Sequence, residues 1–312
     1  MHRGDDRFEL LTLCACKGVD WRVLAREAQR PGGLGRLREG TVSEASRVGR
    51  ETAKALRAAR TNSDDRAIWV EKQLTLADAA GARLVTVLDD DYPLNLRLIF
   101  NLPPFLFWRG TLRPDDARSV AVVGTRQATV EGVRQAGEMA RALTELEVTV
   151  ASGLAKGIDT AAHEATLAAG GRTLAVIGTG ILRCYPAENR ALAERIAENG
   201  AVVSQFWPDS APTRSSFPMR NVTMSGITQG SVVIEASATS GAKMQARLAL
   251  EHGKRVFLIE SLVTNQRWAQ EYLKRPGAVA VRSAAEVVNL LKSSEAIQEL
   301  TSLRRQLVME LA

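Results

Sequence analysis

Four short segments combine glycine or a small hydroxyl residue with a nearby cation, and each follows a run of apolar, β-branched residues. They are Gly124-Thr125-Arg126, the stretch 152–159 with Lys156, Gly178-Thr179-Gly180 with Arg183, and Thr239-Ser240-Gly241 with Lys243. Glycine lets a backbone approach a ligand closely, and the free N–H groups and dipole at a helix start attract phosphate. Any strand-to-helix turn needs glycine, so one segment means little. Four of them indicate a site for a polyanion or nucleotide.

The motifs of several nucleotide enzymes and hydrolases are missing. Gly178-x-Gly180 lacks the third glycine of the dinucleotide fingerprint, and no Gly-Lys-Ser/Thr string marks a P-loop. The absence of Gly-x-Ser-x-Gly leaves His163 and His252 without a hydrolase context. We therefore expect His163, four residues after Asp159, to pack or hydrogen-bond within its own sheet edge.

The string Phe217-Pro218-Met219-Arg220-Asn221 leads into a helix-like stretch that ends near Ser225 and Gly226. Its aromatic ring can stack on a base, its guanidinium can hold a phosphate, and its amide can bond to a base edge. A helix start anchored by Phe217 explains the same residues equally well. The string alone leaves both interpretations open.

The elements that must position these segments follow from an alternation of short apolar runs with helix-length segments after Gly81. We expect strands over 84–88, 120–123, 148–151, 173–177, 202–203, 232–234 and 256–259, and helices over 129–146, 158–169, 187–199 and 241–252. The pattern predicts an α/β fold with a doubly wound, mostly parallel sheet and helices on both faces. Because the strand exits of such a sheet gather at one edge, the four segments should meet there.

The chain before and after the sheet reads as helical. Residues 8–80 predict helices that are interrupted at 31–35, resume over 43–60 and end in a polar turn at 61–65. Two further helices are expected at 284–292 and 295–311. We therefore predict a small helical domain at 1–80, the sheet domain at 81–283 and a short helical tail at 284–312.

Composition permits a nucleic-acid partner without demonstrating one. The 312 residues are 45% hydrophobic and 24% charged, as in ordinary globular proteins, and 41 Lys plus Arg against 35 Asp plus Glu give a net charge of +6. Residues 17–60 hold eleven basic and five acidic residues, an excess that equals the whole net charge. The positions of individual cations are therefore more informative than the total.

Neither a membrane span nor a cofactor is expected. No uncharged stretch reaches the roughly 18 apolar residues that a membrane helix needs, and the acidic N-terminus is unlike a signal peptide, so we expect a cytoplasmic protein. Cys14 and Cys16 could begin a metal site, but no second Cys or His pair lies nearby. We expect them to be small apolar residues of a helix, with no metal.

Taken together, the strings resemble the DprA/Smf family of DNA-processing proteins over roughly residues 84–280. The matching strings are Val123-Gly124-Thr125-Arg126; Ser152-Gly153-Leu154-Ala155-Lys156-Gly157-Ile158-Asp159 with His163; Gly178-Thr179-Gly180 with Tyr185-Pro186 and Asn189; Phe217-Pro218-Met219-Arg220-Asn221; and Glu235-Ala236 with Ser240-Gly241. Upstream, Asp91-Tyr92-Pro93 with Leu96, and Pro103-Pro104 before Arg109-Gly110, resemble the lead-in to the family's domain. So many matches in one order make the resemblance specific.

The resemblance implies an extended Rossmann-like domain that binds single-stranded DNA, shields it from nucleases and helps to load the RecA recombinase, with a part in natural transformation. Such proteins act as homodimers and are not known as enzymes, so no catalytic residue is expected. Residues 1–80 take the position of the family's SAM-like domain, and the family's frequent C-terminal winged-helix module is expected to be missing or reduced to the short tail.

Carried over to this sequence, the family's site places phosphate contacts at Arg126, Lys156, Arg220 and Lys243, with Asn221 and Phe217 nearest a base. The full set of predicted DNA- or phosphate-binding residues is Gly124, Thr125, Arg126, Ser152, Gly153, Lys156, Gly157, Gly178, Gly180, Phe217, Arg220, Asn221, Ser240, Gly241 and Lys243.

The sequence departs from the family pattern at Val222, where a second arginine is usual, and at Gln205, where a glutamate is usual. Loss of one arginine at a phosphate-binding loop removes a contact worth about 1 to 3 kcal/mol. A further departure is Leu258-Ile259-Glu260-Ser261, in a place where the family has Pro-Gly.

Two alternative functions stay open. One is a nucleotide-binding enzyme or sensor like the related lysine-decarboxylase-like phosphoribohydrolases, with Glu235 as catalytic carboxylate and Arg126 as phosphate clamp. That group's Pro-Gly-Gly-x-Gly-Thr string is absent, however. The other is a diverged family member used in anti-phage defence.

Overall fold

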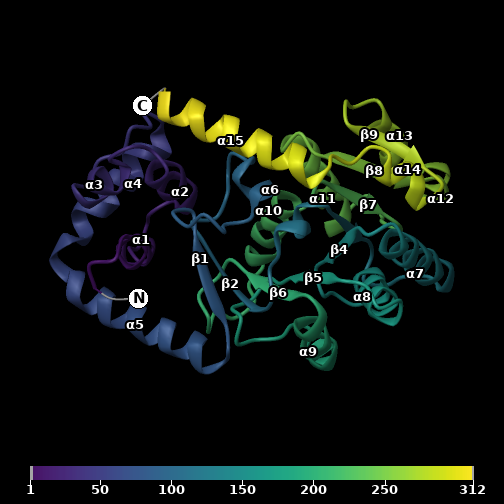
Figure 1. The fold of residues 1–312 in the computed structure, drawn as a ribbon, viewed down its shortest axis with the longest axis horizontal. Coiled ribbons are helices and arrows are strands. Elements are labelled where there is room, and N and C mark those ends of the chain that lie inside the picture. Colours follow the sequence, from purple (N-terminus) through teal and green to yellow (C-terminus); the bar gives the residue numbers. More distant parts are fainter. Residues whose placement is uncertain (1–2, 311–312) are drawn as a thin grey trace.

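A nine-stranded sheet runs through the part of the chain that the computed structural model describes, residues 3–310 (Figure 1). The strands are β1 (Arg83–Thr86), β2 (Phe105–Gly110), β3 (Ser119–Val123), β4 (Thr149–Ser152), β5 (Thr173–Val176), β6 (Ala201–Ser204), β7 (Gly230–Val233), β8 (Arg255–Ile259) and β9 (Ala278–Val281). Their order is β1-β2-β6-β5-β4-β3-β7-β8-β9, and β2 runs antiparallel to both neighbours while all other pairs are parallel. The predicted α/β fold with a mostly parallel sheet is confirmed.

The central strands are apolar throughout because both of their faces are covered. Every residue of β3 is buried, and Val122 lies opposite Val232 of β7. All seven predicted strands are present to within a few residues. The sequence did not single out β2, which extends the sheet beside β6, or the edge strand β9.

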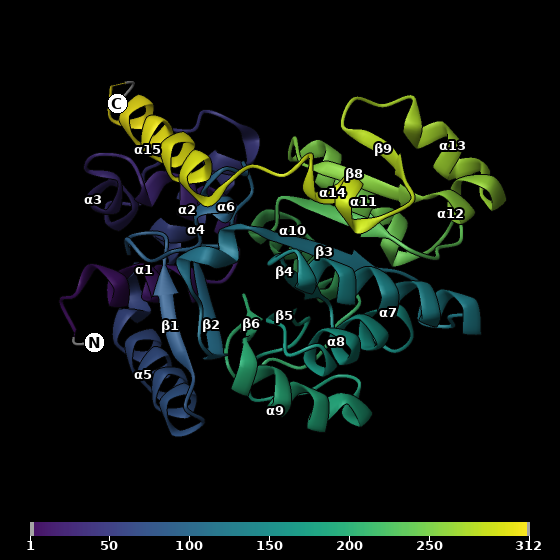
Figure 2. The same cartoon turned by 45° about the vertical axis from the view of Figure 1, so that its right-hand side comes forward.

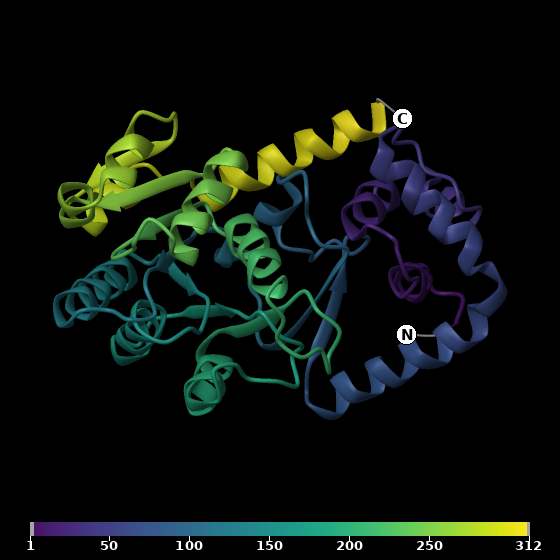
Figure 3. The same cartoon turned by 180° about the vertical axis from the view of Figure 1, so that it is seen from behind.

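Helices cover both faces of the sheet. Those that follow β1 are α6 (Leu94–Arg97), η2 (Pro114–Ala117), α7 (Val130–Glu145), α8 (Ile158–Ala168), η3 (Ala187–Asn189), α9 (Arg190–Asn199), α10 (Ser216–Ile227), α11 (Gly241–Glu251), α12 (Glu260–Asn265), α13 (Arg267–Leu273), α14 (Ala284–Val288) and α15 (Ser294–Glu310). Helices α7, α8 and α9 pack on one face, whereas α10 and α11 pack on the other (Figures 2 and 3).

The direction of winding reverses beside β3. From β3 the chain adds β4, β5 and β6 on one side, then returns through α10 to place β7 and β8 on the other side. Ligands of doubly wound sheets bind at the carboxyl ends of the two strands that flank such a switch point. The fold therefore directs attention to the loops that follow β3 and β7.

The helices before the sheet are α1 (Asp6–Cys14), α2 (Trp21–Ala28), α3 (Gly33–Arg38), α4 (Arg47–Ala58), η1 (Ala59–Asn62) and α5 (Ser63–Ala79). The predicted polar turn over 61–65 is wrong, because η1 and the first turn of α5 occupy those residues. Asp64 and Asp65 lie in that first turn, where negative charge stabilises a helix start. Helix α3 likewise begins inside the predicted interruption at 31–35.

An aromatic cluster joins these helices to the sheet. Trp207, in the loop after β6, lies 4.8 Å from both Trp69 of α5 and Phe105 of β2, measured between ring centroids. Trp21 of α2 lies 5.0 Å from Phe105, and the Gln73 amide donates to Asp209. The buried apolar side chains of both regions form one core. The domain boundaries at residues 80 and 283 stay a prediction.

Helix α15 follows the sheet and passes over α6, back toward the N-terminal helices (Figure 1). Predicted helix residue Leu311 lies outside the described residues. Within residues 3–310 no helix is long and apolar enough to cross a membrane.

Candidate nucleic-acid interface

A cavity of about 510 Å³ opens at the carboxyl edge of the sheet, between the loops after β3 and β7 and the helices α10 and α11. We call it the switch-point cavity. Eight of the predicted residues line it: Gly124, Thr125, Arg126, Phe217, Arg220, Asn221, Ser240 and Gly241. The structure thus brings together strand exits that lie more than a hundred residues apart in the sequence.

A cation rests on an aromatic ring at this cavity. The exposed Arg126 guanidinium lies 5.2 Å from the centre of the Phe217 ring, and the half-exposed Tyr185 ring lies 5.6 Å from the same centre. Phe217 also packs against the backbone of Gly178, where an added Cβ would lie only 2.8 Å from Cδ1 of the ring. Glycine at 178 therefore lets the ring lie against the end of the sheet.

Unlike Arg126, Arg220 is buried, with only 6% of the side chain exposed, and its guanidinium bonds to the protein itself. Its Nη1 donates to the carbonyl oxygens of Gly153 and Val176, and its Nε donates to Asn221 Oδ1. Nη2 makes no hydrogen bond among the described residues. Arg220 therefore ties the exits of β4 and β5 to α10, and its contact with a phosphate stays a prediction.

Asp159 is the buried counterpart of Arg220. This side chain, 5% exposed in the first turn of α8, accepts hydrogen bonds from the N–H groups of Gly153 and Ala155. Burial raises the pKa of the Asp159 carboxyl, and the positive charge of Arg220 opposes that rise. The N–H of Gly153 thus donates to Asp159, and its carbonyl oxygen accepts from Arg220.

His163 has the structural role expected from its position. Its Nδ1 lies 2.7 Å from Thr173 Oγ1, and this hydroxyl donates to the Val150 carbonyl oxygen. Because the hydroxyl has a single proton, which it donates to Val150, Nδ1 must be the donor in this hydrogen bond. Burial, assisted by the charge of Arg220, lowers the pKa of His163 to about 3.

Seven predicted residues do not line the cavity: Ser152, Gly153, Lys156, Gly157, Gly178, Gly180 and Lys243. Ser152 is buried and its hydroxyl donates to the Val122 carbonyl oxygen. Gly157 has a φ of +77° beside the Thr125 carbonyl, and Gly180 packs against the carbonyl of Trp207. These three residues shape the loops.

The two lysines of the predicted set already have partners. Lys156 Nζ lies 2.6 Å from Glu188 Oε1 in an ion pair whose two side chains are more than half exposed. Lys243, in the first turn of α11, lies 5.8 Å from the Trp268 ring centre. Exposed ion pairs contribute little to stability, so Lys156 remains available to a phosphate.

Glu235 lies two residues after the end of β7, and its carboxylate is engaged. Oε2 accepts from both the backbone N–H and the hydroxyl of Thr129, at 3.0 Å each, and Thr129 caps the start of α7. This carboxylate therefore stabilises a helix start.

Several lining residues were missed by the sequence. Gln127 and Ser237 belong to the same two loops, and Met244 and Gln245 come from α11. Gln245 is only 1% exposed. The signal in the sequence was an amide on a helix face that is otherwise apolar. Among the described residues no group of three or more His, Cys, Asp or Glu side chains is placed to hold a metal ion. Cys14 and Cys16 are buried free thiols.

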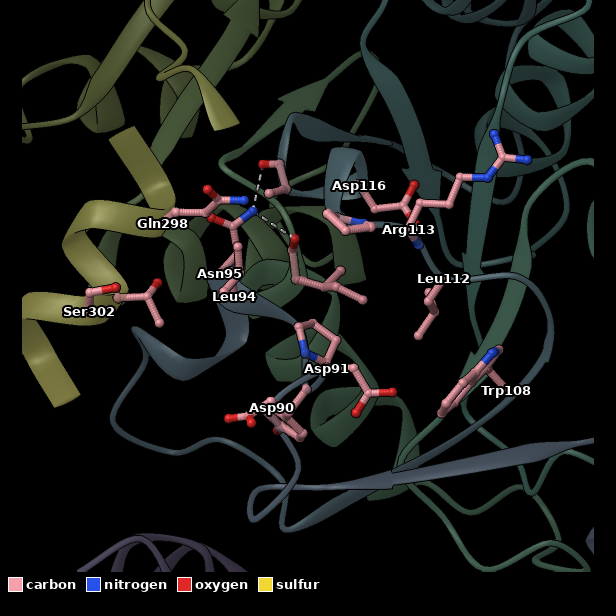
Figure 4. A pocket seen from close by; sticks show the side chains of 16 residues that line it. Asp90, Asp91, Leu94, Asn95, Trp108, Leu112, Arg113, Asp116, Gln298 and Ser302 are labelled. Carbon is pink, nitrogen blue, oxygen red and sulfur yellow. Dashed lines mark hydrogen bonds between the residues drawn. The ribbon is translucent and has the colours of Figure 1, made fainter. Parts of the chain in front are cut away.

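A separate cavity of about 450 Å³ lies at the opposite edge of the sheet, beneath α15 (Figure 4). Two of its polar side chains hold the fold together: the Asn95 amide donates to the carbonyls of Ala117 and Ile227, and Asp116 pairs with Arg172. None of the predicted site residues lines it.

Residues 83–292 match the sequence profile of DNA recombination-mediator protein A. The chain belongs to this family. The chain is 36% identical over 229 residues to the DNA processing protein DprA of Streptococcus pneumoniae, a match that covers 71% of this chain and 81% of that protein. It is 32% identical over 209 residues to DprA of Bacillus subtilis, covering 66% and 70%. The resemblance to the DprA/Smf family is thereby confirmed.

Solved structures agree with this family membership. The X-ray structure of DprA from Streptococcus pneumoniae superposes with a TM-score of 0.71 at 28% identity, over 92% of this chain and 98% of that one. The fold is shared with DNA processing protein A from Helicobacter pylori, with a TM-score of 0.59 at 24% identity. That structure was reported for its single-stranded DNA binding mode. That match covers 67% of this chain and 94% of the other.

Two glycine substitutions test whether the buried hydrogen bonds of Arg220 and Asp159 stabilise the carboxyl edge of the sheet. One lies in this network and the other at the open cavity. Gly153→Ala places a Cβ onto the Arg220 guanidinium, so we expect a loss of about 3 kcal/mol in the free energy of unfolding. Gly241→Ala meets no atom within 4 Å at the start of α11 and should change it by less than about 1 kcal/mol. Urea unfolding measures both, and equal effects would show that the network does not stabilise the edge.

The buried histidine predicts a pH dependence. In the unfolded chain His163 binds a proton near its ordinary pKa of 6.5, whereas in the folded chain it stays neutral down to about pH 3. Because the unfolded state then binds more protons, the free energy of unfolding falls as the pH drops below 6.5. At about pH 5 the loss amounts to about 2 kcal/mol. His163→Asn keeps an N–H donor but cannot titrate, so its unfolding free energy should fall less between about pH 7 and pH 5. Equal falls in both proteins would contradict the assignment.

Proposed function

We propose that this chain binds single-stranded DNA at the switch-point cavity and acts in DNA recombination or uptake. The observation that carries the proposal is the exposed Arg126 guanidinium on the Phe217 ring beside the cavity. A guanidinium binds the phosphate, and an aromatic face stacks on a base of any sequence. Membership of the recombination-mediator family supports the same function.

A second source of positive potential is the start of α11. Ser240 caps this helix through the Lys243 N–H, and Ser240, Gly241 and Ala242 line the cavity. The space around Gly241 is open, so a phosphate can approach the helix start closely. Helix α8 offers less, because Asp159 already places a carboxylate in its first turn.

The same geometry favours single strands over duplexes. The face of the Phe217 ring can stack only on a base that is free of its own neighbours, and duplex bases remain stacked on one another. We therefore expect oligo-dT to bind more tightly than a duplex of the same length.

We also propose that the chain is not an enzyme. A phosphoribohydrolase would need the Glu235 carboxylate to be free for catalysis, whereas it accepts two hydrogen bonds from Thr129. Asp159 lines the cavity, but it is buried and accepts hydrogen bonds from the N–H groups of Gly153 and Ala155, and His163 is fully buried. Release of a free base from a nucleoside monophosphate by the purified chain would contradict this proposal.

The wider role follows from the family. We propose that the chain works in the cytoplasm as a homodimer, protects the bound strand from nucleases and passes it to a RecA-type recombinase. The family description as a recombination mediator supports the transfer. No cofactor is needed for binding of this kind.

Replacing Arg126 tests the proposed site. Arg126→Ala should weaken oligo-dT binding about tenfold and reduce the slope of log affinity against log salt by about 0.7, because one phosphate contact is lost. Fluorescence anisotropy with labelled oligo-dT at several salt concentrations measures both quantities.

Arg195→Ala is the matched control. Arg195 is half-exposed on α9 and pairs with Glu164 of α8, so the variant loses the same charge away from the cavity. We expect it to bind like the wild type. If the two variants bind oligo-dT equally well, the phosphate site is elsewhere.

The transfer step has its own test. The chain should shorten the lag before RecA assembles on a single strand that is already coated with single-strand-binding protein, and Arg126→Ala should shorten it less. The readout is RecA's DNA-dependent ATPase. A wild-type chain that binds the strand but leaves the lag unchanged would refute the transfer and leave binding intact.

A further inference from the structure

A second cavity, of about 850 Å³, lies on the other side of α10 from the switch-point cavity. We call it the α10 cleft. Phe217, Arg220 and Asn221 line the switch-point cavity, whereas Met219 and Val222 line the α10 cleft. Pro218 and Met244 line both, so the two cavities meet at the first turn of α10.

The α10 cleft is built from segments far apart in the sequence. One wall comes from the start of α2 at Trp21, a second from the β6–α10 loop at Phe206, and a third from α11 at Leu248. The aromatic cluster of Trp21, Phe105 and Trp207 fixes the first wall against the second. Its volume is typical of ligand pockets, which occur often where two regions of a protein meet.

The lining suits a flat, uncharged group with polar edges. Phe206, Met219, Val222 and Leu248 offer apolar surface, and the side chains of Ser210 and Thr213 offer hydroxyl groups. Two of the three departures from the family pattern, Gln205 and Val222, line this cleft and not the switch-point cavity. Neither carries a charge, so these two departures make the cleft less charged. Val222 therefore does not remove a phosphate contact from the switch-point cavity, contrary to the expectation from the sequence.

Two cations line the same cleft. Arg22 is held through several hydrogen bonds by Asp20, which is 19% exposed and also lines the cleft, whereas Arg247 pairs with Glu251 at side-chain exposures of 51% and 37%. An ion pair as exposed as the second one is weak, so a phosphate can compete for Arg247. The cleft thus joins an apolar interior to a cation that complements an anionic strand.

We propose that the α10 cleft binds a nucleobase of the same strand whose backbone occupies the switch-point cavity. This inference rests on the proposed single-strand binding. The strand passes between the two cavities at Pro218, in the first turn of α10, and Met244 of α11. One base therefore stacks at Phe217, and a following base enters between Phe206 and Met219. The helical region thereby becomes part of the DNA-binding surface through α2.

Matched substitutions and an abasic strand test the base in the cleft. Met219→Glu puts a carboxylate at a side chain that is 39% exposed, and Leu146→Glu makes the same change at 37% exposure at the end of α7. The first should weaken binding of an oligo-dT of about 12 nucleotides roughly tenfold, and the second should not. An abasic strand of equal length should bind the wild type far more weakly than oligo-dT does. The ratio of the oligo-dT affinity to the abasic-strand affinity should be at least about threefold smaller in Met219→Glu than in the wild type.

Crosslinking of the wild-type chain gives an independent readout. A strand that carries 5-iododeoxyuridine should crosslink on irradiation within residues 205–222 and 244–248, including Phe206 or Met219. Crosslinks confined to the loop at Arg126, together with Met219→Glu binding like its control, would overturn the cleft and leave single-strand binding standing. No binding of oligo-dT by wild type would overturn the proposed function itself. A change of oligomeric state in Met219→Glu with unchanged DNA affinity would assign the cleft to a second copy of the chain.

Discussion

The backbone of Gly153 connects two buried charged side chains, and the carboxyl edge of the sheet is organised around it. Its N–H donates to Asp159 and its carbonyl accepts from Arg220, and both side chains are at most 6% exposed. Removal of either partner would leave the other charge buried without compensation, which is strongly destabilising. The hydrogen bonds of Arg220 fix the exits of β4 and β5 relative to the start of α10, and its charge adds to burial in lowering the pKa of His163.

The two arginines at the cavity have different roles. Arg220 donates to carbonyl oxygens of the fold, whereas the exposed Arg126, which lies on the Phe217 ring, can bind a ligand. Glu235 stabilises the start of α7 and leaves the start of α11 open, with Ser240 and Gly241 beside the cavity. A buried arginine thus builds the loops, and a neighbouring exposed arginine and a helix start supply the electrostatic attraction.

Much of this arrangement could be predicted from the sequence. Apolar runs located the strands from β3 to β8, and the parallel order placed their glycine-rich exits together. The sequence could not distinguish Arg126 from Arg220, because the burial of Arg220 arises from its contact with the carbonyls of Gly153 and Val176. The role of Glu235 was equally hidden, since its partner Thr129 lies more than a hundred residues away. The α10 cleft needs walls from α2, the β6–α10 loop and α11, which no local pattern connects.

The charge excess of the helical segment 17–60 equals the whole net charge of +6, so net charge alone does not tell where a DNA strand binds. The central claim is that the strand binds at the switch-point cavity. Hydrogen–deuterium exchange of the chain with and without oligo-dT tests it most directly. We expect slower exchange in the loops 124–129 and 237–241 and at the start of α10, on both sides of the switch point. Protection confined to residues 17–60 or to the cavity beneath α15, with the switch-point loops unchanged, would contradict the account.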